Sequence, residues 1–324
     1  MSILSVGMAF CDIPLRPCPA NIMELDNYQI RKVEMHTGGD ALTVAVVLAK
    51  MGAEVELNAK VGNDAGGKFV LSELEKNGVC AEAVTVEENY ATATSYQLIE
   101  ENGQRHFLVD SEINKLLKNK DVTDEQIQKA DIIFMGSALA MEGMNDQEIS
   151  ALFQRAHKEG KITAMDASVA VTDSESCKMN LLRQTLQHTD IFIPSYEEAS
   201  YLAQKEKVED IIEAFRQFPL KVFGIKLGAE GCVLTDFKET IYRKPYKGKP
   251  VVDTTGAGDC FMGGFLYAYS NGLSMEECGK FGSAVSAFGI SAVGPSTAVP
   301  DYETVLQFIK DSEEGTDNGI QTKI

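Results

Sequence analysis

Hydrophobic and polar residues follow two different patterns along most of this chain. Short, almost wholly apolar runs predict buried β-strands. They fall at Ile3–Phe10, Glu54–Lys60, Asp131–Gly136, Ile162–Asp166, Asp190–Pro194 and Lys221–Lys226. Between them, apolar residues recur at helical spacing in Ala41–Met51, Gly67–Asn77, Asp146–Lys158, Met179–His188 and Tyr196–Ala203. Strands without a polar face that alternate with helices indicate a mostly parallel sheet covered on both faces, so we expect a three-layer α/β/α fold.

Two segments depart from this alternation of apolar strands and helices. Tyr28–His36 alternates polar and apolar residues with no helix before it. Thr94–Asp110 carries the Asn-Gly turn signal of a β-hairpin, at Asn102-Gly103, between two β-rich runs. Half-buried, alternating strands do not belong inside a parallel sheet. We therefore expect a small β-sheet lid over the main domain, built from insertions at about residues 13–37 and 90–111.

The rest of the chain adds a two-stranded stretch and three helices to the main domain. The two-stranded stretch is predicted at Cys232–Lys244, and the helices at Gly258–Ser270, Met275–Ile290 and Tyr302–Lys310. The last residues, 313–324, are polar and without periodicity, which predicts a flexible tail. We expect one large domain over residues 1–312, with the lid strands inserted into it.

Composition and charge exclude several classes of protein. The longest apolar runs are far shorter than the ~20 residues that cross a bilayer, and the first residues lack the features of a signal peptide. Seven cysteines without a CxxC pair indicate reduced thiols, so we expect a cytoplasmic protein. The net charge of −18 repels nucleic acids and anionic membranes, and we expect neither as a partner.

The strongest chemical signal is the run Asp253–Asp259, DTTGAGD, which leads into a predicted helix. Three small residues at a helix start leave backbone N–H groups exposed, and these amides can bind an anion together with the helix dipole. A plain turn into a helix would use the same residues, because an aspartate in the first turn is favoured by the dipole.

A family resemblance gives this motif a function. Asp253–Asp259 resembles the DTxGAGD signature of the ribokinase-like (PfkB-type) carbohydrate kinases. Gly38-Gly39-Asp40, followed by Ala45, Ala49 and Met51-Gly52, resembles the family's second signature. Further similarity, in matching order, lies at Gly7–Asp12, Val61–Gly67, Ile193–Ala199, Lys226–Gly231 and Gly294–Pro300. The resemblance implies a ribokinase-like fold with a β lid, and transfer of the γ-phosphoryl group of ATP to a hydroxyl, expected to be primary, of a sugar or keto-sugar acid.

The resemblance also implies roles for single residues. Asp259 would be the catalytic base that accepts the proton of the substrate hydroxyl, which requires a carboxylate within hydrogen-bond reach. The amides of Gly256, Ala257 and Gly258 would bind the phosphoryl oxygens. Sugar binding falls to Asp12, Gly38, Gly39, Asp40 and Thr43, although many relatives have Asn at the position of Thr43.

The nucleotide and its cations have implied ligands as well. Lys226, Gly228 and Gly231 would border the phosphates of ATP. Glu198 would help to hold Mg²⁺ through water, although Ser195 replaces the Asn of the family's NxxE motif. Some relatives bind K⁺ through main-chain oxygens and the equivalents of Asp253 and Thr255, so K⁺ is a further candidate cofactor.

The sequence leaves the acceptor open. A nucleoside kinase of the same fold and a sugar-binding relative with weakened catalysis are the alternative functions. Lid side chains such as Arg16, Tyr96 and Arg105 could decide between neutral and acidic sugars. Exposed lid strands also favour pairing of two chains, so a homodimer through the lid is expected.

Overall fold

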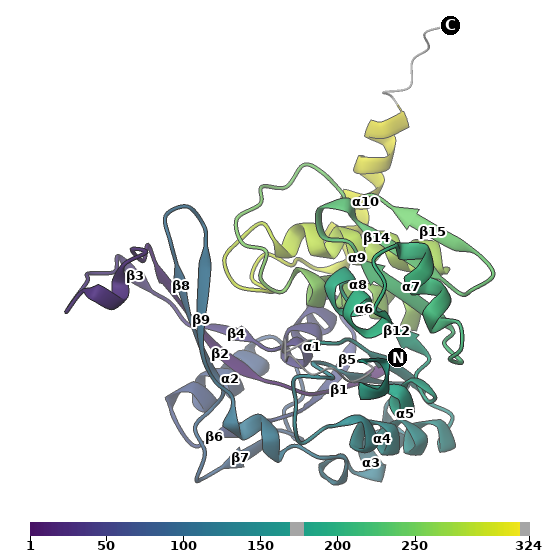
Figure 1. The fold of residues 1–324 in the computed structure, drawn as a ribbon, viewed down its shortest axis with the longest axis horizontal. Coiled ribbons are helices and arrows are strands. Elements are labelled where there is room, and N and C mark those ends of the chain that lie inside the picture. The colour runs from purple at the N-terminus through teal and green to yellow at the C-terminus, as the bar shows by residue number, and fades with distance from the viewer. Residues whose placement is uncertain (169–177, 318–324) are drawn as a thin grey trace, which may run out of the picture.

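An eight-stranded sheet runs through the centre of the molecule (Figure 1). The computed structural model describes residues 1–168 and 178–317. In order across the sheet, the strands are β15 (Thr240–Arg243), β14 (Cys232–Thr235), β13 (Val222–Lys226), β12 (Ile191–Phe192), β11 (Ile162–Met165), β10 (Ile132–Met135), β1 (Ser2–Val6) and β5 (Glu54–Asn58). Neighbouring strands from β5 to β13 pair in parallel, and β14 and β15 pair antiparallel. The predicted, mostly parallel sheet is therefore confirmed.

Helices cover both faces of this sheet. Their bounds are α1 (Asp40–Lys50), α2 (Ala65–Lys76), α3 (Asp124–Lys129), α4 (Asp146–Lys158), α5 (Arg183–Leu186), α6 (Tyr196–Ala203), α7 (Val208–Phe215), α8 (Ala257–Ser270), α9 (Met275–Gly289) and α10 (Tyr302–Asp317). Adjacent strand residues enter opposite cores: Ile132 packs with α1, α8 and α9, and Ile133 packs with α4, α6 and α7. Two covered faces explain why these strands have no polar side. None of the described helices has both the length and the apolar character needed to cross a membrane.

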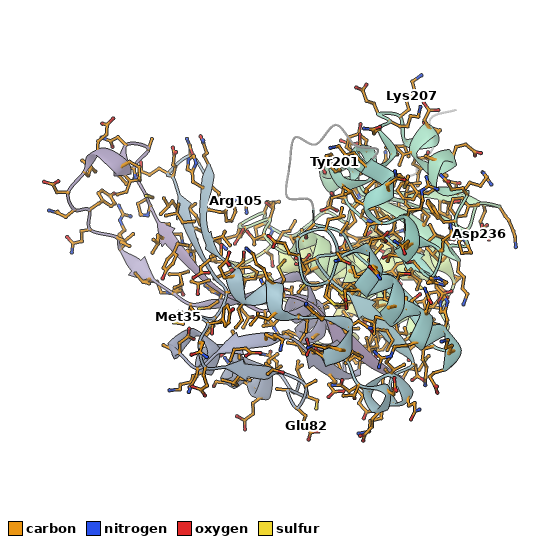
Figure 2. All side chains as sticks on the ribbon, turned by 60° about the horizontal axis from the view of Figure 1, so that its bottom comes forward. Met35, Glu82, Arg105, Tyr201, Lys207 and Asp236 are labelled. Carbon is orange, nitrogen blue, oxygen red and sulfur yellow. The ribbon has the colours of Figure 1, made fainter. Side chains whose placement is uncertain are left out.

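A second sheet stands at one side of the main body (Figures 1 and 2). Its strands are β3 (Lys32–Val33), β2 (Phe10–Arg16), β8 (Thr94–Ile99) and β9 (Arg105–Asp110), with β4 (His36–Gly38) paired to β2. Strands β8 and β9 form the predicted antiparallel hairpin, and Gly103 in its turn has a φ of 88°. We call this second sheet the lid. A further short pair joins β6 (Lys60–Gly62) to β7 (Thr85–Glu87).

The prediction of one strand over Ile3–Phe10 is wrong. The main-sheet strand β1 ends at Val6, and the lid strand β2 begins at Phe10. Gly7 separates them with a φ of 148°, and a Cβ at this position would lie 2.9 Å from the carbonyl oxygen of Gly136. The strand Tyr28–His36 is also shorter than predicted, because within it β3 covers two residues and β4 begins at His36.

Two helix predictions need correction as well. The helix expected over Met179–His188 is a 3₁₀ turn, Lys178–Leu181, followed by the short α5. Helix α7 was not predicted, although its apolar residues Ile211, Ile212 and Phe215 are buried. Helix α10 continues to Asp317, past the expected start of the tail at residue 313. The end of that predicted tail, residues 318–324, lies outside the described residues.

Candidate active site

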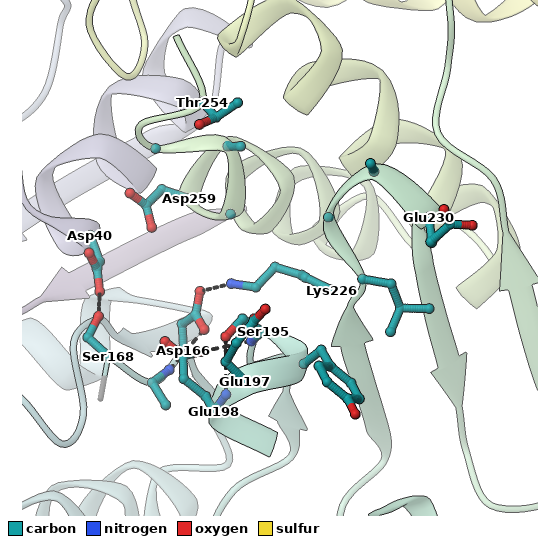
Figure 3. A pocket seen from close by; sticks show the side chains of 18 of the residues that line it. Asp40, Asp166, Ser168, Ser195, Glu197, Glu198, Lys226, Glu230, Thr254 and Asp259 are labelled. Carbon is teal, nitrogen blue, oxygen red and sulfur yellow. Dashed lines mark hydrogen bonds and ion pairs between the residues drawn. The ribbon is translucent and has the colours of Figure 1, made fainter. Parts of the chain in front are cut away.

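A cavity of about 780 Å³ opens beyond the carboxyl ends of the central strands (Figure 3). In open α/β sheets this edge is where ligands bind. The cavity is lined by residues from six segments. These are Asp40 at the start of α1, residues 166–168 after β11, 195–198 at the start of α6, Val208 at the start of α7, 226–230 after β13, and Thr254 with 256–259 at the start of α8.

The start of α8 presents the predicted anion site to this cavity. Gly256 precedes the helix in the left-handed region, with a φ of 72°, and a Cβ there would meet the Cα of Pro295 at 2.9 Å. Glycine is therefore required for this turn. The amide of Ala257 makes a long hydrogen bond of 3.3 Å to the carbonyl oxygen of Thr254. The first N–H groups of a helix have no partner within the helix, so they can donate to a bound anion.

Asp259, in the first turn of α8, extends into the cavity between Asp40 and Lys226 (Figure 3). Burial raises its pKa well above the ordinary carboxylate value, and the negative charges of Asp40 and Asp166 raise it further. Lys226 acts in the opposite direction, because its positive charge favours the ionised carboxylate. Asp259 is thus a stronger base than an exposed aspartate would be.

Lys226 forms a buried ion pair with Asp166, a residue that the sequence analysis did not select. Burial alone would lower the pKa of Lys226, but Asp166 and Glu198 more than offset this effect and raise it. Burial raises the pKa of Asp166 to about 7 despite the nearby ammonium group. Lys226 is therefore held as a cation that points into the cavity. Asp166 is the last residue of the predicted strand Ile162–Asp166 and directly follows the observed strand β11. Its place at the carboxyl end of a parallel strand was the signal for it.

Asp40 is fixed by two serine hydroxyl groups. Its Oδ2 atom accepts hydrogen bonds from Ser137 at 2.7 Å and from Ser168 at 2.6 Å. Ser137 follows β10 with a φ of 57°, a conformation that is uncommon for residues other than glycine. Both donors come from other strand ends, and they hold the carboxylate of Asp40 at the cavity wall.

The other predicted sugar ligands lie away from this cavity. Asp12 is 7% exposed and borders a separate pocket of about 10 Å³ beside His36, Gln97 and Asp253. Burial raises the pKa of Asp12 to about 7, and the charge of Asp253 contributes to the rise.

Backbone glycines and a core threonine complete the predicted sugar ligands. A Cβ on Gly38 would collide with the carboxylate of Asp12, and one on Gly39 would lie 2.5 Å from the carbonyl oxygen of Met8. Both glycines thus allow a close approach of the backbone. The Thr43 side chain is 1% exposed within α1, and its buried Oγ1 atom has no hydrogen-bond partner among residues 1–168 and 178–317. None of these three residues is among those that line the large cavity.

Glu198 and the glycines after β13 have structural roles that compete with the predicted ones. The Glu198 carboxylate accepts a hydrogen bond of 2.7 Å from the amide of Ser195, which completes a capping box at the start of α6. Burial raises the pKa of Glu198. Gly228 lines the cavity, whereas Gly231 allows a close approach to the carbonyl oxygen of Arg243.

Arg105 reaches from the lid to the segment before the anion site. Its Nη1 atom donates to Thr255 Oγ1 at 2.6 Å and lies 3.3 Å from Asp253 Oδ1, and its Nη2 atom donates to Thr254 Oγ1 at 3.0 Å. Figure 2 shows Arg105 where the lid meets the main body. The sequence suggested Arg105 as a sugar contact, and in the structure it binds the protein itself.

Comparison with known proteins agrees with this fold. Residues 2–302 match the family model described as pfkB family carbohydrate kinase. The chain therefore belongs to the pfkB family of carbohydrate kinases, ATP-dependent enzymes that phosphorylate sugars.

Individual relatives and structures are similar over most of their length. An uncharacterized sugar kinase of Archaeoglobus fulgidus is 29% identical, and the match covers 78% of this chain and 98% of that protein. A fructokinase with bound ATP from Xylella fastidiosa superposes with a TM-score of 0.82 and 21% identity, covering 96% of this chain and 99% of that one. A fructokinase double mutant from Vibrio cholerae, in a form with bound fructose, ADP and potassium ion, gives a TM-score of 0.79 and 19% identity, with coverage of 95% and 98%. At this level of identity the two structures establish the shared fold.

Proposed function

We propose that this kinase transfers the γ-phosphoryl group of ATP to a hydroxyl of a neutral sugar or polyol, with Asp259 as the catalytic base. The observation that carries the proposal is the position of Asp259 in the first turn of α8, facing the cavity beside the anion-binding amides. Its raised pKa suits a group that must accept a proton. An acceptor hydroxyl hydrogen-bonded to Asp259 would lie close to a phosphoryl group bound at the helix start.

The positive charges at the site suit a phosphoryl donor. Gly256, Ala257 and Gly258 contribute helix-start amides, and Lys226 adds a full positive charge held by Asp166. Such donors stabilise the charge that the phosphoryl oxygens carry during transfer. We place the phosphates of ATP along residues 226–230 and 254–258, with Gly228 close to them and Gly231 shaping the turn behind.

Oxygen donors near these phosphates fit a hydrated Mg²⁺ ion. The described residues that line the cavity include the ammonium group of Lys226 and six acidic residues, namely Asp40, Asp166, Glu197, Glu198, Glu230 and Asp259. No three His, Cys, Asp or Glu side chains among residues 1–168 and 178–317 form a complete metal site. Mg²⁺ usually keeps several waters and takes few carboxylates, so we propose that Glu198 binds its water shell. When bound, Mg²⁺ neutralises phosphate charge.

The acceptor side favours a neutral polyol over a sugar acid. Asp40 and Asp259 present carboxylates to the cavity, and these accept hydrogen bonds from hydroxyl groups but repel a carboxylate. The lid cations that could have bound an acid are engaged elsewhere. Arg105 contacts Asp253, Arg16 lies 3.7 Å from Glu34, and burial lowers the pKa of His36. We assign Asp12, Gly38, Gly39 and Thr43 to the wall behind the sugar, with Asp40 and Asp259 in contact with it.

A coupled ADP-release screen over neutral sugars, polyols, sugar acids and nucleosides, with Mg²⁺, tests the proposal. We expect a neutral polyol to exceed every sugar acid and nucleoside at least ~10-fold in kcat/KM, a ratio that two or more unpaired polar groups would produce. A nucleoside that outperforms all sugars would make the chain a nucleoside kinase, and a preferred sugar acid would contradict the charge argument. Binding of a sugar without ADP release would indicate the catalytically weakened relative.

We also propose a homodimer formed through the lid. Strand β9 is an edge strand with exposed apolar side chains, and Phe107, Leu108 and Val109 are each at least half exposed. An exposed apolar edge readily pairs with another chain. The molar mass from light scattering should be twice that of the 35.3 kDa chain. Phe107→Lys should yield the monomer, and a wild-type monomer would contradict the proposal.

A cytoplasmic location completes the proposed function. Six cysteines in the described part of the chain, Cys11, Cys18, Cys80, Cys232, Cys260 and Cys278, are free thiols. Free thiols suit a reducing compartment, where ATP is also available. Cell fractionation with an antibody against the protein would test this location.

A further inference from the structure

The contact between Arg105 and the DTTGAGD segment joins two parts of the enzyme that lie far apart in sequence. Arg105 begins the second strand of the lid hairpin, and Asp253 is 148 residues later. One guanidinium group contacts the Asp253 carboxylate and the hydroxyls of Thr254 and Thr255. The Arg105 side chain is 31% exposed and that of Asp253 is 12% exposed, so the contact is largely shielded from water. It ends one residue before the helix-start amides.

This contact uses side-chain oxygens of Asp253 and Thr255, the two residues that the family resemblance assigns to K⁺ beside main-chain oxygens. Asp253 Oδ1 accepts hydrogen bonds from Arg105 and, at 2.9 Å, from the amide of Thr255. Asp253 Oδ2 faces the amide of Gly294 at 3.4 Å, and Thr255 Oγ1 accepts from Arg105. A K⁺ ion bound to Asp253 would also lie beside a guanidinium group that always carries a positive charge. The side chains present therefore do not fit a K⁺ site.

We propose that Arg105 fills the role of a monovalent cation in this kinase, so that turnover requires no K⁺. The inference rests on the proposed function, because it gives Arg105 the task of holding the segment that leads into the anion site. Arg105 is a positioning residue, since it contacts Asp253, Thr254 and Thr255 rather than a reacting atom.

The replacement has a mechanical consequence that a free ion would not have. A bound ion can neutralise Asp253 whatever the lid does, whereas Arg105 brings its charge on the lid hairpin itself. The loop before Gly256 is therefore ordered when the hairpin lies against the main body. Closure of the lid over the acceptor therefore also completes the anion site. This coupling limits hydrolysis of ATP before an acceptor is enclosed.

The first experiment compares wild-type enzyme in potassium chloride and in choline chloride at matched ionic strength. We expect kcat to agree within about twofold, and the melting temperature of the Mg-ADP complex to agree within about 1 °C, because no ion binds. Activation by K⁺ of more than about fivefold, or a rise in melting temperature caused by K⁺, would overturn the proposal. Such a result would place an ion beside Asp12 and Asp253. The melting comparison needs no acceptor, so it reports on Arg105 even if the substrate class is wrong.

The second experiment uses Arg105→Ala, Arg105→Lys and the control Lys32→Ala. Lys32 is another cationic residue of the lid, and it pairs with Glu34 at the exposed side of the lid rather than with the loop. We expect Arg105→Ala to lose roughly 10–100-fold in kcat, as misplacement of a reacting group does, and the control to stay within about twofold of wild type.

Responses to cations separate a charge role from packing. Potassium should restore part of the turnover of Arg105→Ala and raise the melting temperature of its ADP complex, whereas choline should do neither. Arg105→Lys should keep more activity than the alanine variant, since it keeps the charge. Full activity of Arg105→Ala in choline chloride would overturn the proposal. The proposal would also be overturned if Arg105→Ala and Arg105→Lys lost turnover equally and no cation restored it.

Discussion

Replacing Asp12 with asparagine should stabilise the ligand-free enzyme above pH 7. The carboxyl of Asp12 is 7% exposed, and burial together with the charge of Asp253 raises its pKa from 3.8 to about 7. A carboxyl whose pKa is raised on folding stabilises the native state when protonated, and this contribution is lost as pH rises from about 4 to about 7. Ionised Asp12 therefore lowers the stability of the folded protein above pH 7.

The pKa of Asp12 sets the size of the expected gain in folding free energy. A shift of roughly 3 units at 1.36 kcal/mol each sets a ceiling of about 4 kcal/mol. Asparagine keeps the shape but buries an amide, so we expect a gain of about 1–3 kcal/mol at pH 8. With an unfolding entropy of about 2.1 cal/mol/K per residue over 324 residues, this gain raises the melting temperature by about 1.5–4.5 °C.

Thermal unfolding of the ligand-free enzyme at pH 5 and pH 8 measures the effect. Asp12→Asn should differ from wild type at pH 8 and differ little at pH 5, where Asp12 is protonated. Asp190→Asn is the matched control of opposite sign. Asp190 is also buried, but hydrogen bonds from Thr163 and Lys221 outweigh burial and lower its pKa, so its removal should destabilise the protein at pH 8. Equal melting temperatures for Asp12→Asn and wild type at pH 8 would refute the reasoning.

Three further substitutions test the catalytic side. Asp259→Asn should lower kcat by roughly 10²–10⁴ with ATP binding retained, and a variant with over a tenth of wild-type turnover would exclude Asp259 as the base. Because burial raises the pKa of Asp259, wild-type kcat/KM should fall as pH drops through a value above the ordinary range; a profile flat down to about pH 4 would contradict this. Asp166→Ala should raise the KM for ATP about 10-fold and change the acceptor KM little, since it releases the ammonium of Lys226; an unchanged KM for ATP would remove Asp166 from the site. In Gly258→Val the new Cβ would lie 3.0 Å from Lys226 Nζ, so turnover should fall more than thermal stability, and an equal loss of both would indicate a purely structural turn.

The part of the site that the sequence could place at a helix start is the part whose surroundings are local. Asp259 and the glycines before it form one turn into one helix, and seven consecutive residues specify that turn. Asp166, Ser137 and Arg105 instead act through partners 60, 97 and 148 residues away. Pairing across such distances depends on strand order, which the hydrophobic pattern does not encode.

The same distinction explains the errors in the fold. The hairpin β8–β9 was predicted because its turn signal lies within it. The break between β1 and β2 was missed, because the apolar run continues from one sheet into the next. Burial of Val6 and Phe10 in the same core makes the two strands look like one in sequence.

The short link between β1 and β2 ties the geometry of the lid to the central sheet. Three residues, 7–9, separate β1, which pairs with β10 and β5 in the main sheet, from β2, an interior strand of the lid. Gly7 packs against Gly136 without room for a Cβ, so the direction in which the lid departs is set by the sheet itself. Selection for a new substrate can therefore act far from any sugar contact. A substitution at position 7 or 136 would change the orientation of the whole lid, and it would also move the guanidinium group of Arg105.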